Sequence, residues 1–380
     1  MKIRAAVLQE MGRPTLYARS RPLQVADVEL DEPGPGELLL KIGAAGLCHS
    51  DLSVIDGSRP RPMPMVLGHE AAGTVVATGH GVERFEAGDH VVVAFVPACG
   101  QCRPCRQGRA ALCEPGAAAN AAGTLLSGSG RLYDAGGDPL HHHLGVSAFA
   151  DHAVVAAESA IGIPADLPFE LGALFGCAVL TGVGVVVNAA HITPDDQVAV
   201  FGLGGVGMSA VLGARLAGAQ TIIAVDTVAS KLELAERIAG VTTLAASDDV
   251  VDRIRAATGG GADCVIETVG NAAVLAQAYA ATRRGGSTIA VGLPHPDHML
   301  TIPAVSLVAE ERTLKGSYLG SSVPRRDIPR FINHYRDGQL PVEQLLTHRL
   351  ALDDINEGFD RLARGEAVRQ VVVFPDAAAG

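Results

Sequence analysis

The chain has 380 residues, of which 48% are hydrophobic, and this is ample for two or three domains with sizeable cores. The same figure excludes a disordered or collagen-like chain. The 41 acidic and 30 basic residues give a formal net charge of −11, which disfavours nucleic acid as a partner. The sequence shows neither the apolar core of a signal peptide nor a run of about 18 apolar residues, so we expect a cytoplasmic protein that does not enter a membrane.

The first part of the chain, up to about residue 178, is predicted to be rich in β-strands. Short apolar runs at Glu37–Ala45, Gly73–Ala77 and His90–Val96 are separated by glycine and proline. The stretch from Pro115 to Leu144 is polar and rich in turn residues, so we expect it to form a surface loop. Its three consecutive histidines, 141–143, are not expected to bind metal, because neighbouring side chains point in different directions.

From about residue 179 onward, predicted strands alternate with predicted helices. This alternation is typical of a parallel, doubly wound sheet. Beyond about residue 318 the chain closes with two helices and a strand. The predicted strands lie at 197–202, 221–226, 262–268, 287–292 and 369–374, and the predicted helices end at Ala219 or lie at 231–239, 272–283, 327–336 and 352–364.

A glycine-rich segment, GLGGVG at 202–207, follows one predicted strand and opens a predicted helix. That context is what a dinucleotide-binding fingerprint requires. Glycines allow a tight turn and a close approach of the backbone to a pyrophosphate, and the helix N-terminus supplies unpaired N–H groups. The alternative is a glycine-rich turn that binds another ligand. The residues predicted to contact the cofactor here are Gly202, Gly204, Gly205, Val206 and Gly207.

The acidic residue that this fingerprint needs is Asp226, at the end of the next predicted strand. Its carboxylate can accept hydrogen bonds from an adenosine ribose. Because a free carboxylate repels a 2′-phosphate, we predict NAD as the cofactor in preference to NADP. Lys231, five residues further on, is predicted to reach the same ribose.

Four of the seven cysteines fall within fifteen residues: Cys99, Cys102, Cys105 and Cys113. Four thiolates can close a tetrahedral shell around zinc with no position left for water, so this set predicts a structural zinc in a lobe at 97–115. Two disulfides, or a zinc module for nucleic acid, are the alternatives. The absence of an export signal disfavours the first and the negative net charge disfavours the second.

A second set of possible metal ligands is dispersed along the chain: Cys48, His69 and Cys177. Two cysteines and a histidine would leave one position of a catalytic zinc open, but their spacing alone does not show that they meet. Asp51 could orient the ring of His69 through its second nitrogen, and Glu70 could approach the metal from behind. The seventh cysteine, Cys264, is predicted to be a core residue.

These motifs resemble those of zinc-dependent medium-chain alcohol dehydrogenases, including the long-loop, class III-like branch, and the resemblance runs nearly end to end. The stretch Gly68-His69-Glu70, with glycines at 73 and 79 and a valine at 82, is similar to the family's zinc signature. The four-cysteine lobe is similar to its structural zinc site, and GLGGVG with Asp226 is similar to its NAD site. The resemblance implies an α/β protein with a GroES-like catalytic domain, 1–178 and 318–380, and a Rossmann coenzyme domain at 179–317.

The resemblance also implies the ligands and roles that spacing leaves open. Cys48, His69 and Cys177 would hold a catalytic zinc, so that each chain binds two zinc ions and NAD, and the chains would form homodimers or homotetramers. Zinc would act as a Lewis acid on the oxygen of an alcohol while hydride passes to the nicotinamide. Other implied roles are proton transfer for Ser50, pyrophosphate contact for His49 and Arg369, nicotinamide contact for Thr181, and a place in the substrate pocket for Phe95 and His143.

Two departures from the family pattern, Ser53 and His143, bear on function, and so does a missing basic residue after the four-cysteine lobe. His143 stands where some relatives have a pocket-lining aromatic residue, so the pocket is expected to be more polar. Many relatives end a proton relay in a histidine where this chain has Ser53, and serine does not titrate near neutral pH, so we predict a slower or differently pH-dependent oxidation. Glutathione-dependent formaldehyde dehydrogenases use a basic residue shortly after the fourth lobe cysteine, but here none occurs between Cys113 and Arg131. We therefore expect oxidation of a primary or secondary alcohol, with thiol-dependent formaldehyde oxidation and non-enzymatic NAD binding as the alternatives.

Overall fold

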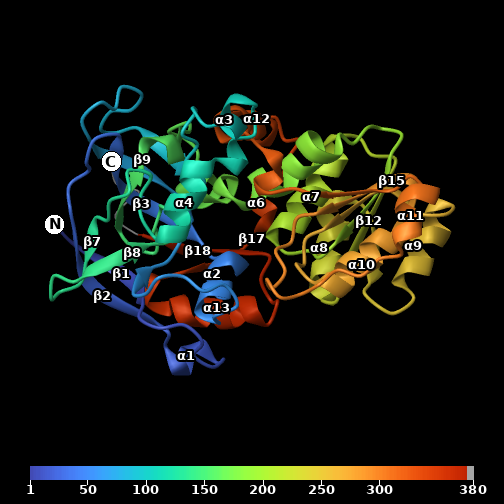
Figure 1. Ribbon diagram of the computed structural model, residues 1–380, viewed down its shortest axis with the longest axis horizontal. Coiled ribbons are helices and arrows are strands. Elements are labelled where there is room, and N and C mark those ends of the chain that lie inside the picture. Colours follow the sequence, from blue (N-terminus) through green and yellow to red (C-terminus); the bar gives the residue numbers. More distant parts are fainter. Residues whose placement is uncertain (375–380) are drawn as a thin grey trace. The chain divides into compact units, whose positions relative to one another are not determined.

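The computed structural model describes residues 1–374, which form two compact units (Figure 1). The first unit consists of Met1–Cys177, Val323–Pro329 and the described part of Leu346–Gly380. The second consists of Ala178–Ser322 and Arg330–Leu345. This division differs from the predicted domain limits mainly at Arg330–Leu345, because helix α12 (Pro324–Arg336) begins in the first unit and continues into the second.

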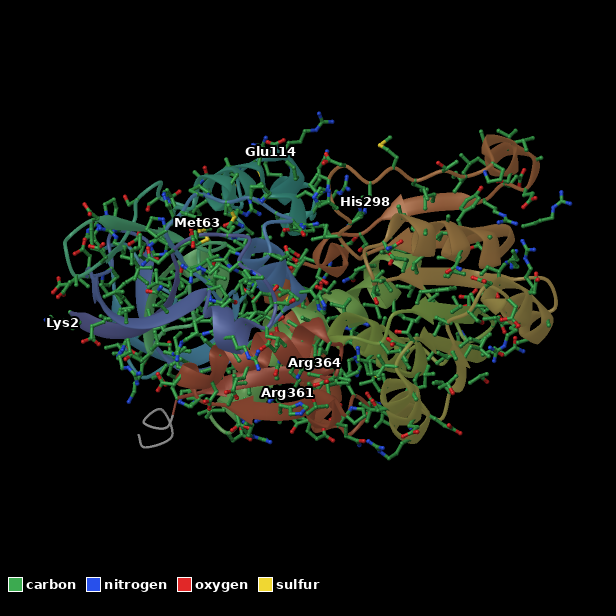
Figure 2. All side chains as sticks on the ribbon, turned by 90° about the horizontal axis from the view of Figure 1, so that it is seen from below. Lys2, Met63, Glu114, His298, Arg361 and Arg364 are labelled. Atoms are coloured by element: carbon green, nitrogen blue, oxygen red, sulfur yellow. The ribbon has the colours of Figure 1, made fainter. Side chains whose placement is uncertain are left out.

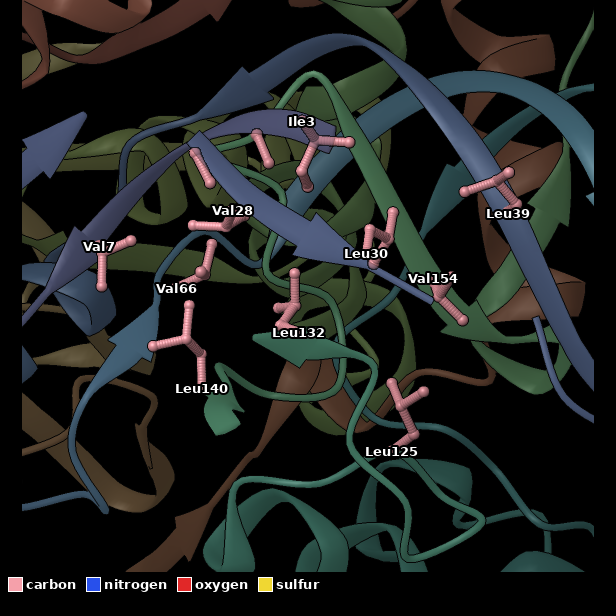
Figure 3. Packing of buried hydrophobic residues seen from close by; sticks show 12 residues of the cluster. Ile3, Val7, Val28, Leu30, Leu39, Val66, Leu125, Leu132, Leu140 and Val154 are labelled. Atoms are coloured by element: carbon pink, nitrogen blue, oxygen red, sulfur yellow. The ribbon is translucent and has the colours of Figure 1, made fainter. Parts of the chain in front are cut away.

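A small closed barrel and a seven-stranded sheet make up most of the first unit. The barrel has the strand order β1-β2-β7-β8-β4, and its interior is filled by apolar side chains such as Ile3, Val28 and Leu132 (Figure 3). The barrel strands are β1 (Lys2–Leu8), β2 (Leu23–Leu30), β4 (Met65–Val66), β7 (Leu132–Tyr133) and β8 (Pro139–His142).

The seven-stranded sheet runs in the order β10-β6-β5-β3-β18-β17, and β9 also pairs with β3. Its central strand β3 is buried along almost its whole length, as a strand covered on both faces should be. The strands are β3 (Glu37–Gly46), β5 (Glu70–Thr78), β6 (His90–Val93), β9 (His152–Ala156), β10 (Ala160–Gly162), β17 (Leu346–Leu350) and β18 (Arg369–Val373).

Short helices connect these strands. Figure 2 labels two arginines near the end of α13 (Ile355–Ala363): Arg361 donates to the buried Gln370, and Arg364 pairs with Glu366 at the surface. The helices of the first unit are α1 (Tyr17–Ser20), α2 (His49–Ile55), α3 (Arg103–Arg106), η1 (Ala110–Leu112), α4 (Glu114–Ala122), η2 (Ala157–Ser159), α5 (Phe169–Gly172), η3 (Ala173–Gly176), η7 (Leu352–Asp354) and α13 (Ile355–Ala363).

The end of the chain completes the first unit. Strand β18 pairs with β3 on one side and with β17 on the other. From α13, the carboxylate of Asp360 accepts the backbone N–H of Tyr17 at 2.6 Å. The amide of Asn356 exchanges two hydrogen bonds with the backbone of Leu23. The N-terminal strands are therefore held by residues that lie more than three hundred positions later.

The prediction of a surface loop between Pro115 and Leu144 was wrong. This stretch forms α4 and the barrel strands β7 and β8, and Leu125, Leu132 and Leu140 enter the barrel core. The turn between the two strands is closed by Asp134, whose carboxylate accepts the backbone N–H groups of the second and fourth residues after it. So short a hairpin is hard to recognise in the sequence, because each strand contributes only one or two core side chains and the leucines stand far apart between turn residues.

The second unit is a doubly wound sheet of six parallel strands in the order β13-β12-β11-β14-β15-β16. This is the strand order of a dinucleotide-binding Rossmann fold and confirms the predicted fold class. The strands are β11 (Gln197–Phe201), β12 (Thr221–Asp226), β13 (Thr242–Ala245), β14 (Ala262–Glu267), β15 (Thr282–Ala290) and β16 (Thr313–Gly316).

Apolar strands and amphipathic helices build the core of this unit. Cys264 pairs with Val198 in the sheet, is 4% exposed, and burial raises the pKa of its thiol to about 12, as expected for a core residue. The helices are α6 (Ala178–Gly184), η4 (Val185–Ala190), α7 (Gly205–Leu216), α8 (Ala229–Ala239), α9 (Val250–Thr258), α10 (Ala272–Ala281), α11 (Ala304–Ala309), η5 (Leu319–Ser321) and η6 (Val342–Leu345).

Within residues 1–374, no single helix is long and apolar enough to cross a membrane. One bent pair, Phe169–Gly176 with Ala178–Ala190, meets the length and composition criteria jointly.

Candidate active site and metal centres

The dispersed cysteine–histidine set is positioned by the junction of β3 with α2. Cys48 is the N-cap of α2, and Asp51 in the first turn accepts its backbone N–H at 3.2 Å. The Cys48 side chain in turn faces the backbone N–H of Asp51, so the two residues form a capping box with cysteine in place of the usual serine or threonine. Both residues are buried, so the helix start fixes a thiol and a carboxylate side by side inside the domain.

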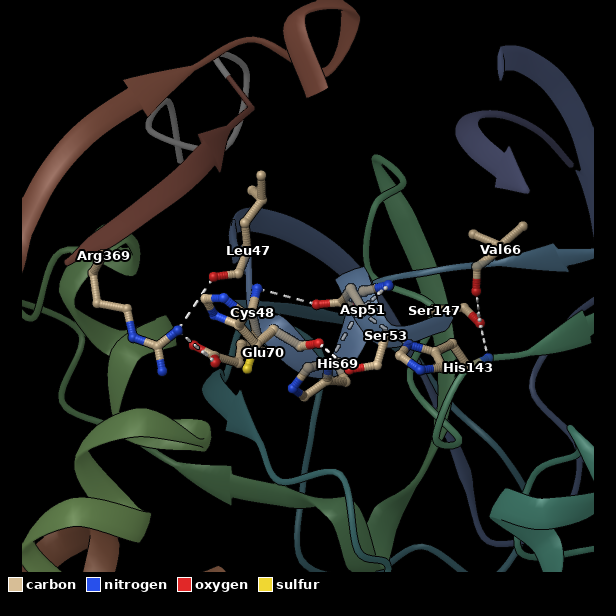
Figure 4. Close-up of polar contacts among 12 residues, drawn as sticks. Leu47, Cys48, Asp51, Ser53, Val66, His69, Glu70, His143, Ser147 and Arg369 are labelled. Atoms are coloured by element: carbon tan, nitrogen blue, oxygen red, sulfur yellow. Dashed lines mark hydrogen bonds and ion pairs between the residues drawn. The ribbon is translucent and has the colours of Figure 1, made fainter. Parts of the chain in front are cut away.

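His69 lies between β4 and β5, with its ring fully buried. Its Nδ1 is 3.1 Å from Oδ1 of Asp51 (Figure 4). When Nδ1 carries the proton, Nε2 keeps a lone pair, and in this structure Nε2 is buried without a hydrogen-bond partner. The backbone N–H of Gly68 donates to the same carboxylate oxygen at 3.2 Å. The carboxylate thus orients the ring as predicted, with an acceptor nitrogen left for a metal.

Cys177 directly follows η3 as its C-cap, and the fold brings it to the same place. The ligand atoms of Cys48, His69, Glu70 and Cys177 all lie within 4.8 Å of one another, and all four residues are buried. A hydrogen bond from the Cys177 thiol, together with contacts to His69 and Arg369, holds the pKa of Cys48 well below its usual range. The predicted ligands therefore meet, which spacing alone could not establish.

The charges of this cluster fit a divalent cation. When both thiols and Glu70 ionise, they and the carboxylate of Asp51 make four buried negative groups near one arginine, Arg369. Such an excess is unfavourable in a buried site unless a cation balances it. Two thiolates and an imidazole nitrogen are ligands that zinc prefers, so the residues present fit this metal.

Glu70 and Arg369 form a buried ion pair that the sequence did not predict. Nη1 of Arg369 is 3.2 Å from Oε1 of Glu70 and donates to the carbonyl of Leu47 at 3.2 Å. Burial raises the pKa of Glu70 to about 7, although the charge of Arg369 acts in the opposite direction. Nothing in the sequence indicated this pair, because it depends on the pairing of β18 with β3, which only the fold reveals. The role of Arg369 at a pyrophosphate stays a prediction.

Four other predicted residues surround this cluster. The ring of Phe95 packs edge-on against His69, with centroids 5.3 Å apart. His143 is buried and contacts Asp51. His49 and Ser50 are the first two residues of α2, exposed and half-buried respectively, and their predicted roles are untested.

Ser53, the first departure noted above, uses its hydroxyl within α2. Its Oγ donates to the carbonyl of His49 at 2.7 Å, one helical turn back. This is the bond that a serine in a helix commonly makes to its own backbone. The hydroxyl is therefore engaged in the helix.

The four cysteines of the lobe also meet, with their sulfur atoms within 4.8 Å of one another. All four are free thiols in the described structure, which speaks against the two-disulfide alternative. Backbone N–H groups of Cys99 and Gly116 point to the sulfur of Cys113, and the N–H of Cys102 points to that of Cys99. Hydrogen bonds with the backbone and neighbouring thiols lower the pKa of Cys102 to about 7. Burial shifts the pKa of Cys105 and Cys113 upward, so the fit to a metal rests on the four gathered sulfur atoms and on the backbone N–H groups that face two of them.

The glycine-rich segment connects β11 to α7 as predicted. Gly202 has φ +88°, and a Cβ there would lie 2.7 Å from a methyl group of Val269. A Cβ on Gly207 would collide with the carbonyl oxygen of Gly202. Because both positions exclude side chains, the helix can start close to the strand end and expose its N–H groups. Thr268 closes the turn by donating to the carbonyls of Phe201 and Gly202, a contact that the motif did not predict.

Asp226 ends β12 beside this turn. One carboxylate oxygen accepts the N–H of Leu203 at 2.6 Å and the other accepts the N–H of Val228 at 2.9 Å. The acidic residue thus fixes the glycine-rich turn in addition to its predicted ribose contact. Lys231 is buried in the first turn of α8, and Thr181 is buried in α6. Their contacts with a cofactor stay predictions.

Comparison with known proteins finds family matches in both units of the chain. Residues 34–165 match the family described as alcohol dehydrogenase GroES-like domain, and residues 205–336 match that described as zinc-binding dehydrogenase. Geraniol dehydrogenase of Castellaniella defragrans is 37% identical over 97% of each chain. S-(hydroxymethyl)glutathione dehydrogenase of Paracoccus denitrificans is 36% identical over 98% of this chain and all of its own.

Among solved structures, benzyl alcohol dehydrogenase from Acinetobacter calcoaceticus superposes with a TM-score of 0.91 at 32% identity. The alignment covers 98% of this chain and 99% of that one. Both cysteine clusters, the glycine-rich turn and these full-length similarities lead to one conclusion. The chain belongs to the zinc-dependent medium-chain alcohol dehydrogenase family and is an oxidoreductase.

Proposed function

We propose that the protein is an NAD-dependent dehydrogenase of small primary or secondary alcohols, with a catalytic zinc at Cys48, His69 and Cys177 and a structural zinc in the four-cysteine lobe. The observation that carries this proposal is the buried meeting of those three ligands within 4.8 Å, with Asp51 fixed on the ring of His69. A protein that only bound NAD would have no need of two cysteines, a histidine and an orienting carboxylate arranged in this way.

The residues around the zinc have separable tasks. Zinc, when bound, would polarise the alcohol oxygen, and NAD would accept the hydride. The two thiolates and His69 leave one coordination position for the substrate. Phe95, packed edge-on against the ring of His69, limits the space beside that position. Ser50 is the proposed proton acceptor for the alcohol hydroxyl, since Ser53 is bonded to its own helix.

Asp226 supports NAD in preference to NADP. Its carboxylate is fixed by two backbone N–H groups at the end of β12, so it cannot easily turn away from a ribose 2′-position. A 2′-phosphate would meet this negative charge directly. His49, Thr181, Lys231 and Arg369 are proposed as the remaining cofactor contacts.

A metal analysis and a substrate panel test the proposal. The purified chain should contain two zinc ions and should form NADH from aliphatic, aromatic or polyol alcohols, followed by its absorbance. NADP in place of NAD should give a much slower reaction. Two zinc ions with no NADH from any alcohol in the panel would refute the proposed activity.

Thiol-dependent formaldehyde oxidation is the second candidate, because a 36% identical relative is an S-(hydroxymethyl)glutathione dehydrogenase. The residues after Cys113 form α4 and contain no lysine or arginine that could hold a thiol's carboxylate. Adding glutathione or mycothiol to formaldehyde should therefore not increase NADH formation. An increase of more than about tenfold would favour this candidate. Homodimer or homotetramer assembly and a cytoplasmic location stay predictions.

A further inference from the structure

Asp51 has a second histidine partner. Nδ1 of His143 lies 3.1 Å from Oδ1 of Asp51, the oxygen that Nδ1 of His69 also contacts at 3.1 Å (Figure 4). The rings of the two histidines stand nearly perpendicular, with centroids 5.5 Å apart. The contact of His143 is bent and falls short of a straight hydrogen bond, but both groups are buried, so the ring dipole acts on the carboxylate without screening by water.

His143 is itself held firmly in place. Its backbone N–H donates to Oγ of Ser147 at 2.9 Å, and that hydroxyl donates to the carbonyl of Val66 in β4 at 2.8 Å. Ser147 and Leu144 have φ values of +55° and +52°, a region that non-glycine residues rarely adopt. Such a conformation persists where the surroundings impose it. The segment therefore connects His143 to β4, the strand that leads into His69.

The carboxylate of Asp51 is enclosed by donors. Oδ2 accepts the N–H of Cys48, and Oδ1 faces the N–H of Gly68 and the two histidine rings. Three of these contacts come from ligand residues or a direct neighbour, namely Cys48, His69 and Gly68, whereas His143 comes from a distant segment.

We propose that His143 is a positioning residue for the zinc site: it fixes Asp51, and through Asp51 it fixes the ring of His69. This inference rests on the proposed function, which makes His69 a zinc ligand. It gives His143 a different task from lining a substrate pocket. An aromatic residue at this position would fill the space but leave the carboxylate with one contact fewer.

The rate of zinc release tests this role, because an outer residue that orients a ligand changes metal retention. Zinc-loaded full-length protein is mixed with an excess of a chromophoric chelator, and the release phases of the two sites are resolved. His143→Leu removes the ring nitrogens at similar volume, and His143→Asn keeps an N–H donor close to the Nδ1 position. His141→Leu, two residues earlier in the same segment, is the matched control. The lobe zinc serves as an internal reference for general loosening of the domain.

His143→Leu should release the catalytic zinc about tenfold faster while the lobe zinc keeps its wild-type rate. His143→Asn should stay within about twofold of wild type, and His141→Leu should not change either phase. After cobalt is exchanged into the catalytic site, the absorption bands should shift in the leucine variant and return in the asparagine variant.

The inference would be overturned if His143→Leu released the catalytic zinc at the wild-type rate. It would also be overturned if the leucine and asparagine variants both released the catalytic zinc and the lobe zinc faster to the same extent. The proposed function fails separately. If wild-type protein held only the lobe zinc or oxidised no alcohol, that proposal would fall whatever the His143 variants did. If wild type held both ions and oxidised alcohols while His143→Leu matched it, only the positioning role would fall.

Discussion

The two cysteine clusters of this protein are built in opposite ways. The lobe collects four ligands from one short loop, and three of the four, Cys99, Cys102 and Cys105, are partly exposed. The other cluster collects Cys48, His69 and Cys177 from three separate segments, and all of them are buried. Backbone N–H groups of the loop itself support the lobe sulfurs, whereas side chains from β5, β18 and the segment after β8 support the second cluster.

Because of this difference, we expect the two zinc ions to contribute to different properties of the protein. The lobe's shape is local, so its zinc should matter mainly for stability. The buried cluster exists only when the whole domain is folded, so its zinc should matter mainly for chemistry. The following substitutions test whether the two sites are independent in this sense.

Removing a ligand of the buried cluster should have the largest effect on activity. In Cys48→Ala, the loss of Lewis-acid stabilisation, worth several kcal/mol, should lower kcat/KM by at least about 10³-fold. Zinc content should fall from two ions to one per chain, measured by atomic emission, with the unfolding midpoint changed little. Activity within tenfold of wild type would show that this cluster does not perform the chemistry.

Removing a lobe ligand should act on stability instead. Cys113 is fully buried and its sulfur accepts two backbone N–H groups. Cys113→Ala should release the lobe zinc and lower the free energy of unfolding by about 3–5 kcal/mol, measured by urea denaturation. Folded protein at low temperature should keep its catalytic zinc. If the lobe zinc were lost with no change in stability, the lobe would need another role.

A smaller effect is expected from Asp51→Asn, which keeps the size of the side chain but removes its charge. The amide cannot accept from all the donors that surround the carboxylate. The affinity of the catalytic zinc should fall roughly 10–100-fold, measured by competition with a chelator, and the lobe zinc should be unaffected. Equal weakening of both ions would contradict the independence of the two sites.

The smallest effect is expected at the seventh cysteine, which belongs to neither cluster. Cys264→Ala removes a small buried group between strands of the second unit and should cost about 1 kcal/mol of stability. Both zinc ions and the activity should remain. Loss of either ion in this variant would mean that the assignment of six cysteines to two metals is wrong.

The residues that could be predicted from sequence are those whose partners are close in the chain. The four lobe cysteines, the glycine-rich turn and Asp226 all act within one loop or one strand–helix–strand unit, so spacing carries the information. Asp51 is the exception, because its predicted contact with His69 spans eighteen residues and is present in the structure.

What could not be predicted depends on distant pairings. The ion pair of Glu70 with Arg369 requires the last strand to lie beside β3. The contact of His143 with Asp51 requires the hairpin β7–β8 to close the barrel, and the composition of that stretch indicated a loop. In both cases a short strand, or the segment after it, brings one polar side chain to a buried site.

The contribution of the last strand to the first unit has a consequence for synthesis on the ribosome. Domains generally fold as units, and the earlier one usually folds first as the chain emerges. Here the second unit is complete once residue 345 has emerged, whereas the first lacks β18 and the partner of Glu70 until Arg369–Val373 are made. We therefore expect the coenzyme unit to fold before the unit that precedes it. The metal-binding cluster of the first unit could then form completely only after Arg369–Val373 have been synthesised.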